Sequence, residues 1–195
     1  FKTLSNRHSV SVGLLQSLFA GPKYHNINLE KILGNTELEI DDIYPDKEYE
    51  ESLHRIQLSQ MGPILRSLWH EMEDEASGFL SQPLKVGVFS MMCHAIISSG
   101  NLRRALLRSA KFIALLTDDL TIELQEIGDE AQLTIHYKNP HNLDQVFFVT
   151  SLFVIWIRLS CWLIERPIIL ERIEFQYPTP GYEEEFSLMF PCRHA

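Results

Sequence analysis

Residues 87–116 contain the pattern that most restricts the fold of this 195-residue chain. Apolar side chains recur there at helical spacing in two runs, and a four-residue turn at 98–101 separates the runs. Gly100 can adopt the left-handed conformation that ends a helix, and Asn101 can cap the helix that follows. The pattern therefore predicts two helices of about three turns each, joined by a short turn.

The segments that follow predict a small sheet and one long helix. Leu120–Ile127 and residues 131–137 alternate apolar and polar side chains around Gly128, which predicts a strand hairpin with one buried face. Residues 169–177 alternate in the same way and predict a third strand of the same sheet. Residues 143–165 predict one long helix across a face of that sheet. The expected fold class is α+β, with a helical N-terminal half packed on a small antiparallel sheet and one long buried helix.

The length and composition fit a single domain. Because 45% of the residues are hydrophobic, the chain can bury a core of its own. We expect residues 1–195 to form one domain, mainly helical over residues 1–117. Residues 118–195 would add the hairpin, the long helix, a strand and a short helix at 181–190.

Two segments of the first half carry further predictions. Residues 59–72 predict a helix that tolerates Pro63 only in its first turn. Residues 28–33 predict a short helix capped by Asn28. Residues 37–51 hold eight acidic side chains around Pro45, which is typical of a solvated surface loop.

Charge and cysteine usage exclude several classes of function. The net charge of −9 argues against a chain that grips nucleic acid by itself, because phosphate binding needs a surplus of Lys and Arg. The odd number of cysteines, Cys93, Cys161 and Cys192, without C-x-x-C spacing, favours reduced thiols over disulfides or a zinc site. The N-terminal residues show no signal peptide. A cytoplasmic protein is the expectation.

Residues 146–164 leave two readings open. They contain a single charge, Arg158, and approach the roughly 20 apolar residues that span a bilayer. A central helix of a soluble domain has the same composition. The flanking strand patterns favour the buried helix.

Arg158 is the most specific candidate for binding a ligand. It shares a helical stripe with Trp162 inside the most apolar segment, and a buried guanidinium must be paired. The partner could be the carboxylate of a small ligand, an internal acid, or water reached by the end of the side chain. Met91, Met92 and His94 on the preceding helix pair could add adaptable pocket walls and a hydrogen bond, or could simply be core residues.

The helix pair has an alternative interpretation as a DNA-reading helix-turn-helix, since its second helix carries Arg103, Arg104, Arg108 and Lys111. The apolar first helix and the acidic net charge favour a helical hairpin packed on the sheet. His70 and Asp74 have i, i+4 spacing but no third ligand nearby, and no catalytic or phosphate-binding motif occurs. We therefore expect no enzyme activity, no metal site and no cofactor.

Three segments together resemble a known family. They are GVFSMMCHAIISSGNLRRALLRSAKFIALLTDDL at 87–120, TIELQEIGDEAQLTIHY at 121–137 and IEFQYPTPGYEEEFSLMFPC at 173–192. They resemble the effector-binding, arabinose-binding-like N-terminal domain of AraC/XylS transcriptional regulators, in the subgroup that responds to ornithine or arginine. None of these motifs is catalytic.

The resemblance implies a function. It implies a cytoplasmic, homodimeric sensor domain that binds a small effector, an amino acid-like or other carboxylate metabolite. That domain would control a C-terminal helix-turn-helix DNA-binding domain, which is absent from this chain. The alternative is a dimerisation or docking module of the same regulator that binds no ligand.

Overall fold

The computed structural model describes residues 9–44, 55–177 and 183–194. Its helices are α2 (Val12–Leu18), α3 (Ala20–Tyr24), α4 (Leu29–Leu33), α5 (Ile40–Ile43), α6 (Leu58–Met72), α7 (Val88–Ile96), α8 (Leu102–Ala114), α9 (Val146–Leu163) and α10 (Glu183–Met189). Its strands are β1 (Ser9–Ser11), β2 (Arg55–Gln57), β3 (Leu120–Ile127), β4 (Glu130–Tyr137), β5 (Arg172–Ile173) and β6 (Arg193–His194). This composition confirms the α+β class.

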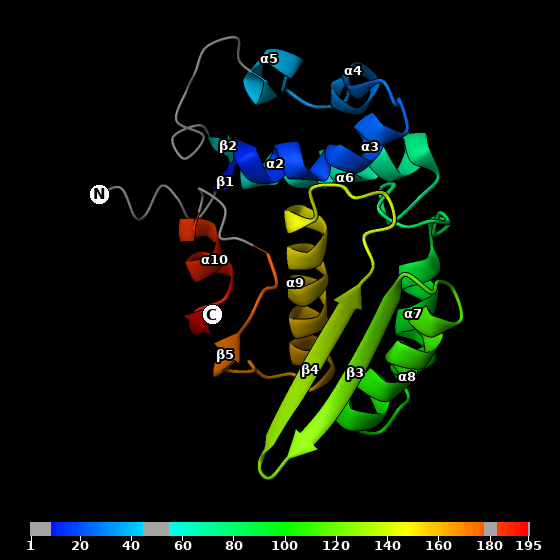
Figure 1. The fold of residues 1–195 in the computed structure, drawn as a ribbon, viewed down its shortest axis with the longest axis vertical. Coiled ribbons are helices and arrows are strands. Elements are labelled where there is room, and N and C mark those ends of the chain that lie inside the picture. Colours follow the sequence, from blue (N-terminus) through cyan, green and yellow to red (C-terminus); the bar gives the residue numbers. More distant parts are fainter. Residues whose placement is uncertain (1–8, 45–54, 178–182, 195) are drawn as a thin grey trace.

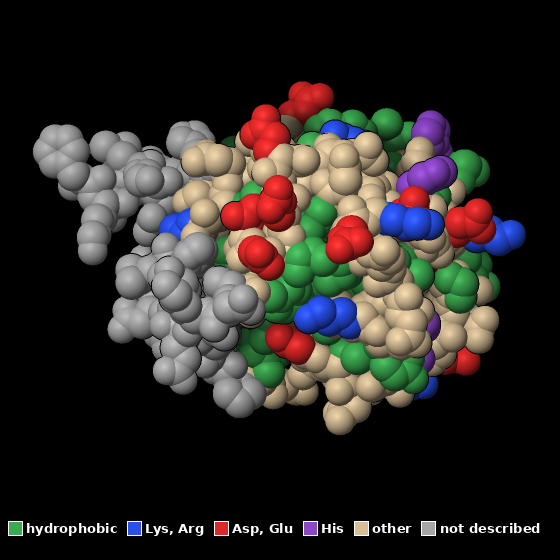
Figure 2. Space-filling view, turned by 90° about the horizontal axis from the view of Figure 1, so that it is seen from above, with side chains coloured by type: hydrophobic (Ala, Val, Ile, Leu, Met, Phe, Trp, Pro, Cys, Tyr) green, Lys and Arg blue, Asp and Glu red, His purple; other side chains and the backbone are tan. Residues whose placement is uncertain are grey.

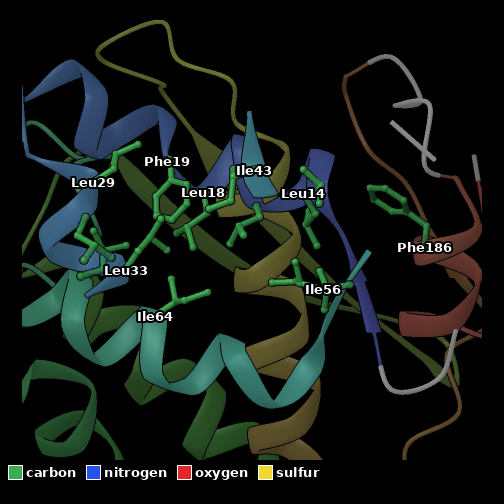
Figure 3. Close-up of a cluster of buried hydrophobic side chains, with 14 of the residues drawn as sticks. Leu14, Leu18, Phe19, Leu29, Leu33, Ile43, Ile56, Ile64 and Phe186 are labelled. Atoms are coloured by element: carbon green, nitrogen blue, oxygen red, sulfur yellow. The ribbon is translucent and has the colours of Figure 1, made fainter. Parts of the chain in front are cut away.

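Helices α2 to α6 and the β1–β2 ladder form a layer at one end of the molecule (Figure 1). Local caps start two of these helices: Ser11 Oγ accepts a hydrogen bond from Gly13 N, and Asn28 Oδ1 accepts one from Glu30 N. The Asn28 cap was predicted and is confirmed. Close-packed aliphatic side chains hold the layer together, among them Leu18, Ile32 and Ile64, all with 0% exposure. Figure 3 shows this cluster between α2, α4 and α6.

Helix α9 runs from that layer along the β4 side of the hairpin β3–β4, and α7 and α8 lie along its β3 side (Figure 1). At its N-terminus the amide of Phe147 donates to Ser17 Oγ of α2, 2.9 Å away. The strands pair antiparallel from Leu120 opposite Tyr137 to Ile127 opposite Glu130. The inner face of the hairpin packs on α7, α8 and α9, as the alternation predicted.

The predicted third strand is wrong. Of residues 169–177, only Arg172–Ile173 are extended in a ladder, and they pair parallel with Arg193–His194 instead of joining β3 and β4. The alternating residues Ile173, Phe175 and Tyr177 face a cluster with α9 and α10. One-sided burial against helices gives the same period of two as a sheet, so the pattern could not distinguish them.

Helix α9 is the long helix expected from the sequence, but the rest of the protein does not bury it on all sides. Phe148, Trp156 and Leu159 are buried, whereas Ile155 is 39% exposed and Trp162 58% exposed. By length and composition α9 could cross a membrane, and 39% of it is buried within the domain. The central helix of a soluble protein has the same length and composition.

Two smaller predictions were tested in the N-terminal half. Pro63 lies inside α6, beyond its first turn, so its expected position was wrong. Of the acidic segment 37–51, residues 45–51 lie outside the described residues. The described part contains the short helix α5. At its start the backbone N–H of the capping residue Glu39 donates a hydrogen bond to Asp42 Oδ2 at 2.8 Å. A local cap thus gives order to an acidic stretch expected to be only a loop.

Candidate functional site

A hollow on the surface of α6 is the candidate ligand site. It has a volume of about 390 Å³ and is lined by Asn35, Pro63, Arg66, Ser67, His70 and Glu71. Asn35 follows α4, and the other residues belong to α6. Specific small-molecule sites commonly occupy 300 to 1,000 Å³, so the size suits a small metabolite, although this hollow is open to solvent.

The spacing of the α6 residues explains why they share one face. Arg66 and His70 are four residues apart, as are Ser67 and Glu71, while Ile64 and Leu68 on the opposite face are buried in the core. This polar i, i+4 pattern was the available sequence signal, and it was not recognised as a site. The neighbouring Asn35 could not be found from spacing, because the packing of α4 on α6 brings it there.

The chemistry of the hollow suits a molecule with both signs of charge. The Arg66 guanidinium, supported by the Ser67 hydroxyl and the Asn35 amide, can bind a carboxylate. The Glu71 carboxylate can bind an ammonium group, and it lies 3.9 Å from the exposed Lys31 ammonium at the rim. A Cβ on Gly62 would lie 3.3 Å from Arg66 Nη1, so glycine leaves room for the guanidinium.

The structure does not bring the predicted ligand residues together. Met92 is buried at 2% exposure, whereas the adjacent Met91 is 62% exposed. His94 is also exposed, and its Nδ1 lies 2.8 Å from Ser90 O in the preceding turn. Arg158 and Trp162 lie on an exposed face of α9. Arg158 is therefore not the buried guanidinium that the apolar segment indicated, because its position on the helix points out of the core.

The space between the sheet and the helices, where a ligand was expected, is occupied by side chains. Ile122 of β3, Met92 and Ile96 of α7, and Trp156 and Leu159 of α9 form one apolar cluster. All five are at most 9% exposed. The interior of this layer is therefore a packed core, and the hollow on α6 lies elsewhere.

The acidic side chains at the end of α6 organise the following loop, a role that the sequence did not reveal. Asp74 is 3% exposed, and its carboxylate accepts hydrogen bonds from Ala76 N, Gly78 N and Leu84 N at 2.7–2.8 Å. Glu75 accepts hydrogen bonds from the amides of Gly87 and Phe89 at the start of α7, at 2.7 and 2.8 Å. These backbone donors lie 2 to 14 residues ahead in the chain.

Residues 78–81 of this loop form a junction between distant segments. Each bonds a different side chain: His25 Nε2 lies 3.3 Å from Gly78 O, Tyr137 Oη donates to Phe79 O at 2.6 Å, His141 Nε2 lies 3.0 Å from Leu80 O, and Ser81 N donates to Asp119 Oδ2 at 2.6 Å. Gly21 of α3 also packs here, since a Cβ on it would lie 2.0 Å from Ser77 O. We call residues 78–81 the junction segment. It connects the N-terminal layer to the hairpin.

The ionisation of two junction groups follows from their surroundings. Burial raises the pKa of the Asp119 carboxyl, but the hydrogen bonds from Ser81 and the charge of Lys138 outweigh it and hold that pKa below its ordinary value. Burial and the neighbouring Asp119 carboxylate raise the pKa of Tyr137. Tyr137 therefore stays protonated and donates to Phe79 O at any physiological pH.

The basic face of α8 is partly engaged in local contacts. Arg103 Nε pairs with Glu126 Oε1 at 3.0 Å, and Arg108 Nη1 donates to Ala95 O at 3.0 Å. Ala105 and Ser109 on the other face are buried. The helix pair is therefore a hairpin packed on the sheet, as favoured over a DNA-reading unit. On the face at the α2–α6 end, acidic and basic side chains are interspersed (Figure 2).

The structure places the His70–Asp74 pair and the three cysteines in different surroundings. No group of three or more His, Cys, Asp or Glu side chains in the described part of the chain is placed to hold a metal ion. His70 and Asp74, the pair with i, i+4 spacing, do not share a site, because Asp74 is buried in the loop and His70 lines the hollow. All three cysteines are free thiols, and burial raises the pKa of Cys93 and Cys192.

Comparison with known protein families matches the chain to a class of N-terminal domains found in transcription regulators. The family model described as the arabinose-binding domain of AraC transcription regulators, N-terminal, matches residues 43–194. Because the match covers most of the chain, the chain belongs to this family, as its three quoted segments predicted.

One curated relative is the ornithine utilization regulator of Pseudomonas aeruginosa, which is 27% identical over 113 residues. The match covers 57% of this chain and 33% of the relative's length. The chain therefore corresponds to only a part of that regulator. No solved structure matches the chain.

Proposed function

We propose that this chain is the ligand-sensing domain of an AraC-type transcription regulator in the cytoplasm. It binds a small amino acid-like or other carboxylate metabolite, and it controls a C-terminal DNA-binding domain of the same regulator. The match of the family model to residues 43–194 carries this proposal. The name of the relative, an ornithine utilization regulator, supports an amino acid as the class of metabolite.

The hollow on α6 is the proposed ligand site. An amino acid carries a carboxylate and an ammonium group, and Arg66 and Glu71 offer the opposite charges from one helix face. A second ammonium group, as in a diamino acid, could donate a hydrogen bond to His70, which lines the same hollow. Sensing requires that the ligand prefer one arrangement of the domain relative to its DNA-binding or dimer partner. Equal affinity for both arrangements would switch nothing.

A thermal-shift screen of amino acids, diamines, sugars and fatty acids tests the sensing function. A ligand at a hundredfold excess over its Kd stabilises the fold by about 2.7 kcal/mol. For a domain of this size we expect an increase in Tm of about 5–11 °C. A screen at millimolar concentrations in which no compound raises the Tm would contradict the sensing function.

Three variants locate the site in the same screen. Arg66→Met removes the proposed carboxylate anchor, Arg104→Met makes the same change on the exposed face of α8, and Arg158→Met removes the anchor predicted from sequence. We expect only Arg66→Met to abolish the shift. Loss of the shift in Arg158→Met alone would assign the site to α9 instead.

A ligand-free homodimerisation module of the same regulator is the second candidate. The packed interior between the sheet and the helices favours it, since buried apolar side chains of α7, α9 and β3 fill the place where a ligand was expected. The exposed apolar side chains of α9 also favour it, because a partner could cover them. Self-association without any ligand-induced shift in Tm would distinguish this module from a sensor.

A further inference from the structure

We infer that the outer edge of β4 is the surface through which two copies of this chain associate, forming one four-stranded antiparallel sheet. This inference rests on the proposed homodimer and names its interface. It rests on three observations: a strand edge that has no strand partner among the described residues, two exposed apolar side chains on the neighbouring helix, and a strand sequence that is complementary to itself.

The edge of β4 is open. Within the described residues β3 and β4 form a two-stranded sheet, so each strand has one edge without a strand partner. Helix α8 packs against β3, whereas β4 lies on the side of α9 (Figure 1). β4 contains eight residues and no proline. A long, regular edge of this kind offers a row of backbone donors and acceptors to another strand.

The helix next to this edge exposes apolar surface. Trp156 and Leu159 of α9 face the sheet, and Phe153 faces Phe175 near α10. Between these two faces, Ile155, Arg158 and Trp162 remain exposed, and we call them the α9 stripe. Ile155 lies one helical turn before Leu159, so the α9 stripe borders the face of α9 that packs on the sheet.

The sequence of β4 fits a second copy of itself. Two antiparallel copies pair over residues 130–138, one residue beyond the end of β4, when Thr134 lies at the two-fold axis. In that register Glu130 faces Lys138, Ala131 faces Tyr137, Gln132 faces His136 and Leu133 faces Ile135 of the other copy. Each apolar inner residue then meets an apolar inner residue, and opposite charges meet at both ends of the paired strands.

The same register fits the existing faces of the hairpin. Leu133 and Ile135 are on the inner face together with Ile122 of β3, and Gln132, Thr134 and His136 are on the outer face. A two-fold axis perpendicular to the sheet maps inner face onto inner face, so no apolar side chain is turned toward water. The two Glu130–Lys138 pairs form only between copies, because eight residues of extended strand separate these side chains within one chain.

Charge reversal tests the register. Glu130→Lys replaces two attractive pairs by two repulsive ones, so we expect the dimer Kd, measured by sedimentation equilibrium, to rise on the order of tenfold. The double variant Glu130→Lys, Lys138→Glu should restore the affinity. Asp129→Lys makes the same change of charge in the turn, outside the paired strand, and should leave the Kd nearly unchanged. Equal Kd values for Glu130→Lys and Asp129→Lys would overturn the inference.

Cross-linking tests the two-fold axis independently. Thr134→Cys should form an intermolecular disulfide under mild oxidation, since directly opposed Cβ atoms in an antiparallel pair lie about 4.5–5.5 Å apart. Gln125→Cys, on the outer face of β3, should not. Cross-linking of Gln125→Cys but not Thr134→Cys would overturn the inference.

The outcomes separate this interface from the wider proposals. A dimer that ignores Glu130→Lys and is not cross-linked through residue 134 places the contact elsewhere and leaves the homodimer intact. A monomer at all concentrations contradicts both the interface and the homodimer. Neither result changes the ligand-induced shift in Tm, which tests sensing alone.

Discussion

Replacing Asp74 by Asn should destabilise the fold far more than the same change at the preceding residue, Glu73→Gln. Both substitutions remove one negative charge and keep the size of the side chain. Asp74 is buried and accepts three backbone hydrogen bonds, whereas Glu73 is exposed at the end of α6. The pair therefore separates the hydrogen bonds of Asp74 from its contribution to net charge.

The geometry fixes the size of the effect. Asp74 Oδ1 accepts from Ala76 N and Leu84 N, and Oδ2 accepts from Gly78 N. The Asn amide can keep the first two bonds but then places its NH₂ group against Gly78 N, so that one buried donor is left unsatisfied at about 1–3 kcal/mol. The two remaining bonds lose their charge and weaken by about 0.5–1 kcal/mol each. The sum is about 3 kcal/mol.

Denaturation measures both variants. For a domain of 195 residues we expect Asp74→Asn to lower the Tm by about 6–12 °C, and the urea midpoint to fall in step without a change in slope. Glu73→Gln should stay within about 0.5 kcal/mol of the parent chain. If the two variants have the same stability, the Asp74 carboxylate does not organise the loop, and its contacts have no energetic role.

Two further substitutions test the neighbouring contacts. Phe79→Ala removes a fully buried ring stacked on Phe148 at a centroid distance of 4.9 Å, and it should cost about 3–5 kcal/mol in urea unfolding; a loss below 1 kcal/mol would mean that the site collapses freely. Because the pKa of Asp119 is held below its ordinary value, the stability it contributes is present above about pH 4 and is lost as the pH falls through the lower folded pKa. Asp119→Asn should therefore unfold with a flatter dependence on pH between about 5 and 2 than the parent chain, whereas Asp118→Asn, at the exposed neighbour, should retain the parent's slope; identical slopes for both variants would refute this.

Elements with local signals were predictable from the sequence. Gly100 has a φ of +78° at the end of the first helix of the hairpin, and Asn101 Oδ1 accepts from Arg104 N at the start of the second. Both roles depend on residues within three positions in the chain. The hairpin β3–β4 was predictable for the same reason, because the turn at Gly128, with a φ of +62°, connects strands that are adjacent in sequence.

Features that depend on distant segments were not predictable. Acidic side chains at the C-terminal end of a helix oppose the helix dipole, so the roles of Asp74 and Glu75 could not be inferred from their position. The backbone donors that satisfy them are supplied by a loop whose course no spacing reveals. Arg158 was misplaced because an 18-residue apolar helix suggests burial on every side, while the neighbours of α9 cover only part of it. The hollow also depends on Asn35, which follows α4 and is brought to α6 only by the packing of the two helices.

The path from the hollow to the open edge of β4 gives the proposed switch a testable property. His70 and Glu71 line the hollow on the last turn of α6, and Asp74 follows directly and holds the loop that contains the junction segment. Tyr137, at the end of β4, donates to that segment at Phe79 O. A ligand that alters the last turn of α6 can therefore bias the position of β4 through two hydrogen-bonded steps. If it does, linkage requires that the two factors agree: because the dimer holds two ligand sites, a ligand that tightens the dimer tenfold must bind each site of the dimer about threefold more tightly than it binds the monomer. The two factors can be measured separately. The first comes from the dimer Kd with and without ligand, and the second from the ligand Kd at protein concentrations above and below the dimer Kd.

Tyr137→Phe breaks the second step, so it should bring both factors towards one. Tyr24→Phe changes an exposed tyrosine outside these two steps and should leave both factors unchanged. Coupling that survives Tyr137→Phe would mean that the signal does not pass through the junction segment.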